Sequence, residues 1–445
     1  MIHAATALLP DGWADGVRLT VTDGRISAVE VGVPGGKGIL CPAPVNLHSH
    51  TFQRAMAGLT EYRTSGQDSF WTWRTLMYRF LAHLLPEDVQ AIAAQVMMEM
   101  AEAGYAAVCE FHYLHHGVGG QSYSELAEMS GRIAAAALDT GLGLTHLPVL
   151  YQQGGCDGRA LQGGQLRFGN DVDGFGRLWE GAQVALRGLP ADTVLGVAPH
   201  SLRAVSVEGL RAAVNFAPDA PLHIHIAEQV AEVEELLAHR GARPVEWVLG
   251  NVDVDRRWCL VHATQMEPFE TAGLAASGAV AGLCPITESN LGDGVFDGVG
   301  WLGAKGRYGV GSDSNVRISL SEELRILEYS QRLLHKGRAM LAGEYSTGRT
   351  LFDAVCAGGA QAAGRRSGAI RVGDWADLVM LDDTGDLGDR TGDAILDTWI
   401  FAGDDRMVRD VWSAGRAIVQ GGRHVQREGI TKAFRGVMAR LAAVL

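Results

Sequence analysis

Histidines and carboxylates are spaced along this 445-residue chain in a pattern that could hold a metal ion. His48 and His50 are one residue apart in NLHSH, directly after the apolar run ILCPAPV. Successive side chains of a strand point to opposite faces, so residues two apart project from the same side. A second alternating stretch, HIHIAE, contains His225 and Glu228, and Asp313 follows a glycine-flanked run in GVGSDS. Neutral imidazoles with one carboxylate suit a zinc-like ion that keeps one position open for water.

The chemistry expected of such a site is hydrolysis. A bound divalent ion lowers the pKa of water toward about 7, which makes hydroxide available near neutral pH. Proton transfer then needs a base and an acid within reach, and Glu228 and His262 are the candidates that remain. The fourth apolar run ends in APHSLR, which offers neither a bridging lysine nor a carboxylate, so we expect one metal ion rather than two.

Short apolar runs alternating with helical patterns must position these residues. Their near-continuous apolar character is typical of strands buried on both faces of a parallel sheet. The runs are ILCPAPVNLHSH, AAVCEFHYL, GLTHLPVLY, VLGVAPHSL, PLHIHIAE, WCLVHAT, AVAGLCPIT and RYGVGSDS. Eight such alternations within about 300 residues predict an α/β fold, a (β/α)8 TIM-like barrel. A doubly wound open sheet is the alternative, although no phosphate-binding glycine motif follows the first run.

Active-site residues of such barrels lie at the C-terminal ends of the strands. The metal-binding candidates lie at the ends of the first, fifth and eighth runs, and His262 lies at the end of the sixth. Other run ends also carry chemically active side chains, namely Glu110, His112 and His223.

The two ends of the chain have a different pattern. Residues 1–44 contain VRLTVTDGRISAVEV, two alternating runs about an Asp-Gly turn, which is typical of a hairpin. Residues 366–445 contain further short strand patterns separated by glycine turns. Because chain termini often lie close together, we expect these ends to form one small β-sandwich domain beside a hydrolase barrel of residues 45–365.

Composition excludes several classes of function. The net charge is −13, from 38 basic and 51 acidic side chains, so the chain should repel nucleic acid and anionic membranes. No apolar run reaches the roughly 20 residues that span a membrane, and no signal peptide is recognisable. The six cysteines include no CxxC pair, which favours a reducing compartment. We therefore expect a cytoplasmic protein, and an acidic substrate would need locally placed arginines.

With these residues in place, the chain resembles the amidohydrolase superfamily. The resemblance is carried by the histidine, glutamate and aspartate positions above and by the tail motif GAIRVGDWADLVML. It implies that a single zinc ion is bound by His48, His50, His225 and Asp313. It also implies that Glu228 and His262 transfer protons.

Longer strings, among them NLHSHTFQRAMAGLTE, EFHYLHH, HIHIAEQ and CPITESNLGDG, resemble the branch of this superfamily that acts on N-formimino-L-glutamate. The implied reaction is hydrolytic deimination of a linear amidine to N-formyl-L-glutamate and ammonia, in histidine degradation. The implied substrate contacts are Gln53, Arg74, Tyr113, His200 and Arg203. The two arginines could bind the carboxylates of this dicarboxylate substrate, and a homodimer is expected.

Two alternatives stay open at this point. Another deaminase of the superfamily would act on a purine or related amidine, and a catalytically inactive barrel would be expected to have lost some of the ligands that are present here. Gln265 and Asn315 stand where some members have histidine. Neither is a predicted ligand, so only the surroundings of the site are affected.

Overall fold

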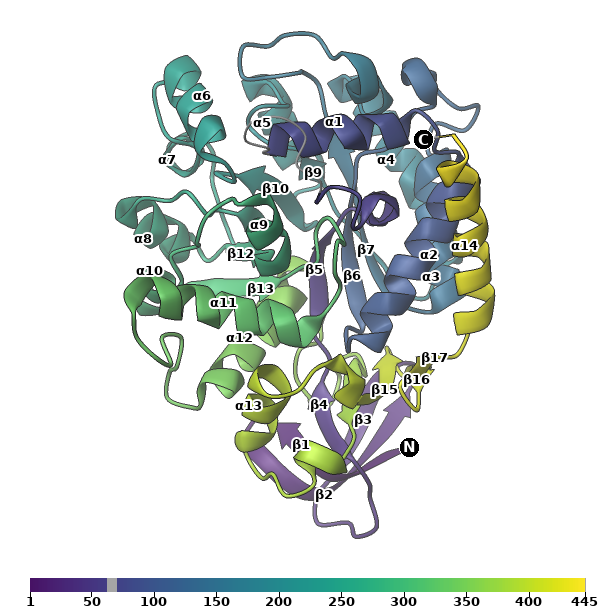
Figure 1. Ribbon diagram of the computed structural model, residues 1–445, viewed down its shortest axis with the longest axis vertical. Coiled ribbons are helices and arrows are strands. Elements are labelled where there is room, and N and C mark those ends of the chain that lie inside the picture. The colour runs from purple at the N-terminus through teal and green to yellow at the C-terminus, as the bar shows by residue number, and fades with distance from the viewer. Residues whose placement is uncertain (62–69, 445) are drawn as a thin grey trace.

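A closed barrel of parallel strands forms the larger part of the protein, and a β-rich domain lies at one end of it (Figure 1). The computed structural model describes residues 1–61 and 70–444, and it describes side chains within these ranges except at 70–72. The barrel strands are β5 Val45–Ser49, β6 Ala107–His112, β7 Gly143–Leu150, β8 Val194–Leu195, β9 Ala198–Pro199, β10 Leu222–Ile226, β11 Trp258–His262, β12 Val280–Leu283 and β13 Arg307–Val310. They correspond to the apolar runs, so the predicted barrel is confirmed.

The strands of the barrel form two parallel sheets. We call the two places where an edge of one sheet meets an edge of the other the seams of the barrel. One sheet contains β5, β6, β7 and β8, with β9 paired to β7, and the other runs from β10 to β13. Among the described residues, the sheets meet through isolated bridges, Ser49 to Asp313 at one seam and Val197 to Leu222 and Ser201 to His225 at the other. Predicted metal ligands therefore lie at or beside both seams.

Helices surround the barrel strands (Figure 1). Those between the strands are α1 Phe70–Leu81, α2 Pro86–Glu102, α3 Glu128–Thr140, α4 Val172–Ala185, α5 Val207–Phe216, α6 Val230–Arg240, α7 Pro244–Asn251, α8 Pro268–Ser277, α9 Pro285–Leu291 and α10 Gly298–Gly303. Those after the last barrel strand are α11 Leu320–His335, α12 Thr347–Ala362, α13 Ala394–Phe401 and α14 Arg427–Ala442.

Helix α2 shows how the sequence pattern produces packing. Val89, Ile92, Val96 and Met100 recur at helical spacing, and all four are fully buried. Burying such a side chain contributes about 1.5–3 kcal/mol. Gly104 follows the end of this helix with a φ of 101°, a conformation that disfavours other residues.

The β-rich domain joins the two ends of the chain in one eight-stranded sheet of the order β17-β16-β15-β14-β4-β1-β2-β3. Its strands are β1 Ile2–Leu9, β2 Gly12–Thr22, β3 Arg25–Glu30, β4 Ile39–Pro42, β14 Leu378–Leu381, β15 Val408–Ser413, β16 Arg416–Gln420 and β17 Arg423–His424. The predicted hairpin is β2–β3, and its turn residues Asp23 and Gly24 both have positive φ. The predicted pairing of the two chain ends is thus confirmed, whereas the exact boundaries at residues 44 and 366 stay predictions.

A buried charge network connects the two domains. Arg365 donates hydrogen bonds to Asp192, in the loop before β8, and to Asp377, beside β14. Arg416 of β16 donates to the same Asp192 carboxylate, at 2.8 Å to each oxygen.

Within the described residues, no helix combines the length and apolar character needed to cross a membrane.

Candidate active site

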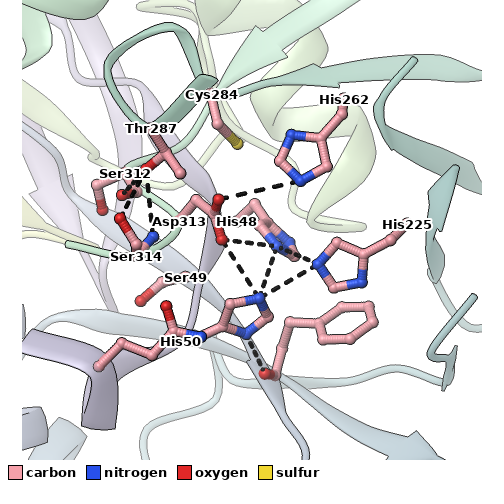
Figure 2. A network of polar contacts seen from close by, with 12 residues as sticks. His48, Ser49, His50, His225, His262, Cys284, Thr287, Ser312, Asp313 and Ser314 are labelled. Carbon is pink, nitrogen blue, oxygen red and sulfur yellow. Dashed lines mark hydrogen bonds and ion pairs between the residues drawn. The ribbon is translucent and has the colours of Figure 1, made fainter. Parts of the chain in front are cut away.

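Four side chains from three strand ends converge inside the barrel (Figure 2). The Nε2 atoms of His48 and His225 are 3.0 Å apart, and that of His50 lies 3.2 Å from each of them. Oδ1 of Asp313 lies 3.5 Å from Nε2 of His48 and 3.3 Å from Nε2 of His50. The structure therefore brings together all four residues predicted to bind metal.

The protonation of these rings shows that the site fits a cation. Nδ1 of His50 lies 2.8 Å from the carbonyl oxygen of Phe111, and Nδ1 of His225 lies 3.0 Å from that of His200. Because a carbonyl only accepts, each Nδ1 carries the proton and each Nε2 presents a lone pair. Burial lowers the pKa of both rings, which keeps them neutral. Two lone pairs would then face each other at 3.2 Å, an arrangement that a cation between them stabilises.

The spacing of the ligand atoms also fits a small divalent ion. Metal–nitrogen distances of 2.0–2.1 Å place the corners of a tetrahedron about 3.3 Å apart. The distances given above range from 3.0 to 3.5 Å. The spacing of the four residues therefore suits one such ion.

Backbone pairing at the first seam fixes three of the four ligands. The amide of His50 donates to the carbonyl of Asp313, and the amide of Asp313 donates to the carbonyl of His48, both at 2.9 Å. Asp313 has a φ of 46°, in the left-handed region. The loop after β13 must hold this conformation to direct Asp313 toward the histidines.

Asn315 supports that loop. Its Nδ2 lies 3.2 Å from Oγ of Ser49, 3.2 Å from the carbonyl oxygen of His50 and 3.0 Å from that of Asp313. Its Oδ1 accepts a hydrogen bond from Ser312. This position, singled out in the sequence because histidine was expected, thus connects both ligand-bearing segments.

The predicted proton-transfer residues lie beside the ligand cluster. Nε2 of His262 is 3.8 Å from Oε1 of Glu228 and 3.9 Å from Oδ2 of Asp313. Its Nδ1 is 3.2 Å from Oε1 of Glu288, a residue that the sequence analysis did not single out. Burial disfavours the charged form of His262, but these carboxylates outweigh it and raise its pKa to about 10. Burial raises the pKa of Glu228 to about 7, so this pair can hold and exchange protons near neutral pH.

One cavity is lined by all the residues predicted to contact substrate and by the proton-transfer pair. Three of the predicted metal ligands, His50, His225 and Asp313, line it as well. Nε2 of Gln53 donates to Oη of Tyr113 at 2.6 Å. Arg74, from α1, and His200 also line the cavity. Nη2 of Arg203 lies 4.0 Å from Oε2 of Glu228. The structure therefore places both predicted carboxylate-binding arginines in the cavity that holds the metal ligands.

Sequence reasoning missed much of the cavity wall. The additional aromatic residues that line it are Trp73, Tyr78, Tyr151 and Phe168. Tyr78 follows Arg74 by one helical turn, so i,i+4 spacing could have identified it. Tyr151 ends the third apolar run and could have been found from its position alone.

Three other strand-end residues lie away from the cavity, and two of them make hydrogen bonds to neighbouring segments. Glu110 accepts hydrogen bonds from the amide and hydroxyl of Thr51, at 2.9 and 2.7 Å. His223 bonds the carbonyl of Ala362 at 2.8 Å, and His112 is buried. None of the three is among the described residues that line the cavity.

Both the barrel and its converging ligands are found in metal-dependent hydrolases. Residues 39–418 match the family model described as Amidohydrolase family, and the chain belongs to this family. Residues 1–38 match the model described as the N-terminal domain of formimidoylglutamate deiminase HutF. The chain is 48% identical over 450 residues to the formimidoylglutamate deiminase of Pseudomonas aeruginosa, and the match covers 99% of each chain. The resemblance predicted from the sequence is thereby confirmed.

Two solved structures illustrate the range of the fold. A crystal structure of an amidohydrolase from Brucella melitensis is 49% identical, with a TM-score of 0.96 and 99% coverage of both chains. An adenosine deaminase from Xanthomonas campestris, solved with bound zinc, is 21% identical, with a TM-score of 0.83 and coverage of 99% of this chain and 98% of its own. The second likeness concerns the fold alone.

Proposed function

We propose that this protein hydrolyses N-formimino-L-glutamate to N-formyl-L-glutamate and ammonia, with one zinc ion held by His48, His50, His225 and Asp313. The observation that carries the proposal is the content of a single cavity. It combines a ligand cluster that fits a divalent ion with two arginines suited to a dicarboxylate. The similar deiminase of Pseudomonas aeruginosa supports the choice of substrate.

The reaction requires two proton transfers. Water adds to the formimino carbon, the bond from this carbon to the terminal nitrogen breaks, and both protons of the water end on that nitrogen, which leaves as ammonia. A zinc ion would supply an acidic water and, by neutralising Asp313, would remove one of the charges that raise the pKa of His262. His262 then accepts a proton from the water. Glu228 delivers its proton to the leaving nitrogen, which its raised pKa of about 7 permits, and His262 passes the first water proton to the same nitrogen. The second water proton moves from the added hydroxyl group to Glu228 as the carbonyl forms, so both residues return to their starting states.

Recognition of the substrate is assigned to the cavity wall. Arg74 and Arg203 bind carboxylates of the glutamate part, because planar guanidinium groups match carboxylates in two-pronged hydrogen bonds. The net charge of −13 makes such local cations necessary for a dianion. The paired side chains of Gln53 and Tyr113 offer polar atoms near His50 that could orient the formimino group.

A second candidate is favoured by the aromatic side chains of the cavity. Tyr113, Tyr151 and Phe168 could stack on a purine. A relative from Natronomonas pharaonis named 5-methylthioadenosine/S-adenosylhomocysteine deaminase is 25% identical over 352 residues, covering 77% of this chain and 73% of its own. The two arginines argue against this candidate, because a neutral purine has no carboxylate for them.

One experiment separates the two candidates. Ammonia release is measured with N-formimino-L-glutamate and with a panel of purine nucleosides, and the metal content of the same sample is determined. We expect release from the formimino substrate alone and one zinc per chain. Turnover of a purine in preference to the formimino substrate would refute the proposal, and purified active protein without metal would refute the zinc site. The expected homodimer stays a prediction for sedimentation analysis.

A further inference from the structure

Asp293 is a buried carboxyl group beside the proton-transfer pair to which the mechanism above gives no role. Its side chain is buried, with the residue only 2% exposed. A carboxylate oxygen of Asp293, one of Glu228 and a ring nitrogen of His262 all lie within 4.8 Å of one another. Glu228 and His262 line the substrate cavity, whereas Asp293 is not among the described residues that do so. Asp293 therefore lies beside the pair but outside the described lining of the substrate cavity.

Three loops of the barrel hold Asp293 in this place. The side chain of Gln229, in the loop after β10, donates to its Oδ1. The side chain of Gln265, after β11, donates to its backbone carbonyl. Its own amide donates to the carbonyl of Glu288, in α9, at 2.9 Å. Glu228 follows β10, His262 ends β11 and Glu288 lies in α9, so the segments that hold Asp293 are also those that position these three residues.

Glycines on both sides of Asp293 permit this turn. Gly292 has a φ of 72° and Gly294 a φ of 116°, which other residues adopt at a cost. A Cβ atom on Gly294 would also lie 2.8 Å from Nε2 of Gln265. The sequence GDG is thus matched to the inward placement of one carboxyl group.

The second oxygen of this carboxyl group is available to the pair. Oδ2 of Asp293 is buried and has no hydrogen-bond partner among the described residues. A buried carboxylate oxygen without a hydrogen-bond partner is rare in native structures and calls for an explanation. Burial and the neighbouring Glu228 raise the pKa of Asp293 to about 9, so it carries a proton that it could share. Two carboxyl groups within 4.8 Å of each other disfavour double ionisation, so at least one of them keeps a proton.

We propose that Asp293 is a positioning residue that holds the carboxyl group of Glu228 in the orientation from which it delivers its proton to the leaving nitrogen. The inference rests on the proposed role of Glu228. It also gives a role to Gln265, which differs from the histidine expected there and which here fixes the backbone of Asp293.

The test combines single variants with a double-mutant cycle, using ammonia release from N-formimino-L-glutamate. Asp293→Ala should lower kcat by about 10- to 100-fold, the usual effect of removing a residue that supports a functional group. KM should stay within twofold, and metal content should stay unchanged. Asp293→Asn, which keeps polar atoms at the same place, should restore most of kcat. In a Glu228→Gln background, Asp293→Ala should cost less than a further twofold, because residues that act as a unit are not additive.

A control variant separates this effect from damage to the loop. Asp297 lies four residues further along and accepts a hydrogen bond from Gly300 at 2.9 Å, at the start of α10. Asp297→Ala should lower the melting temperature without changing kcat. If Asp293→Ala does not fold, Gln229→Met loosens the same carboxyl group and should lower kcat severalfold.

Several results would overturn the inference. They are an unchanged kcat in Asp293→Ala or Gln229→Met, a full additional loss in the Glu228→Gln background, and a loss of activity that follows loss of metal. Wild-type protein that does not release ammonia from N-formimino-L-glutamate would instead overturn the proposed function, and this inference with it. Wild-type turnover in the Glu228→Gln single variant would overturn the assigned role of Glu228, and this inference with it.

Discussion

Replacement of Asn315 by alanine should weaken both the barrel seam and the metal site. The two N–H groups of its fully buried amide are shared among Ser49, His50 and Asp313, and its oxygen accepts from Ser312. Three hydrogen bonds are therefore lost at one time, at about 1 kcal/mol each. Alanine at a φ of 55° adds about 1 kcal/mol, since it tolerates the left-handed region less well than asparagine. We expect the free energy of unfolding to fall by about 3–4 kcal/mol.

The effect should extend to the metal, because Asn315 bonds the backbone of two predicted ligands. Removing a residue that orients ligands typically costs about 10- to 100-fold in metal affinity. Urea unfolding of metal-free protein measures the first effect, and zinc competition with a chelator measures the second. Asn215→Ala is the matched control, because this exposed asparagine of α5 bonds only the carbonyl of Arg211 among the described residues, and its loss should stay within about 0.5 kcal/mol. If Asn315→Ala binds zinc within twofold of wild type and unfolds at the same urea concentration, the reasoning from the seam is wrong.

Three further outcomes are expected. His225→Ala should lose both bound metal and turnover, as measured by metal analysis and ammonia release; an active variant with full metal content would exclude it as a ligand. Arg203→Met should raise KM for N-formimino-L-glutamate by about tenfold or more, because a hydrogen bond to a charged group contributes about 1.5–3 kcal/mol, and an unchanged KM would contradict carboxylate binding. Burial alone would raise the pKa of Asp192, but Arg416 and Arg365 hold it at about 2, below its ordinary 3.8. Asp192 thus contributes about 2 kcal/mol that is present above pH 4 and lost as pH falls through 2. Asp192→Asn should remove this part of the acid dependence of unfolding, and an unchanged acid profile would exclude it.

The barrel could be predicted from the sequence because strands buried on both faces leave unmistakable apolar runs. The runs also place their polar ends at one rim, so the metal ligands followed from chain position. The boundary between the terminal sheet and the barrel was harder to predict from the sequence. The first run, read continuously from Ile39, contains both β4 of the terminal sheet and β5 of the barrel. Pro42 and Pro44 lie at this junction, where the missing N–H groups suit the change of sheet.

Residues held by loops could not be predicted in the same way. Glu288 and Asp293 follow β12 within CPITESNLGDG, where neither strand nor helix periodicity indicates which side chains point inward. The direction of Asp293 depends on the left-handed glycine at 292 and on a hydrogen bond from the side chain of Gln229 in another loop. Phe168 likewise reaches the cavity through tertiary packing, against the rings of Tyr113 and Tyr151 in separate segments. A single sequence carries no local signal for such contacts.

The position of the seams explains why the site depends on side-chain networks. At a continuous ladder, regular backbone hydrogen bonds fix the relative positions of neighbouring strands. Between β5 and the loop after β13, the described residues form one isolated bridge, from Ser49 to Asp313, and the ligands lie beside it. The relative placement of His48, His50 and Asp313 therefore rests on a few bonds, several of them made by Asn315. A bound divalent ion would join the same two strands, so metal binding and closure of the barrel should stabilise each other.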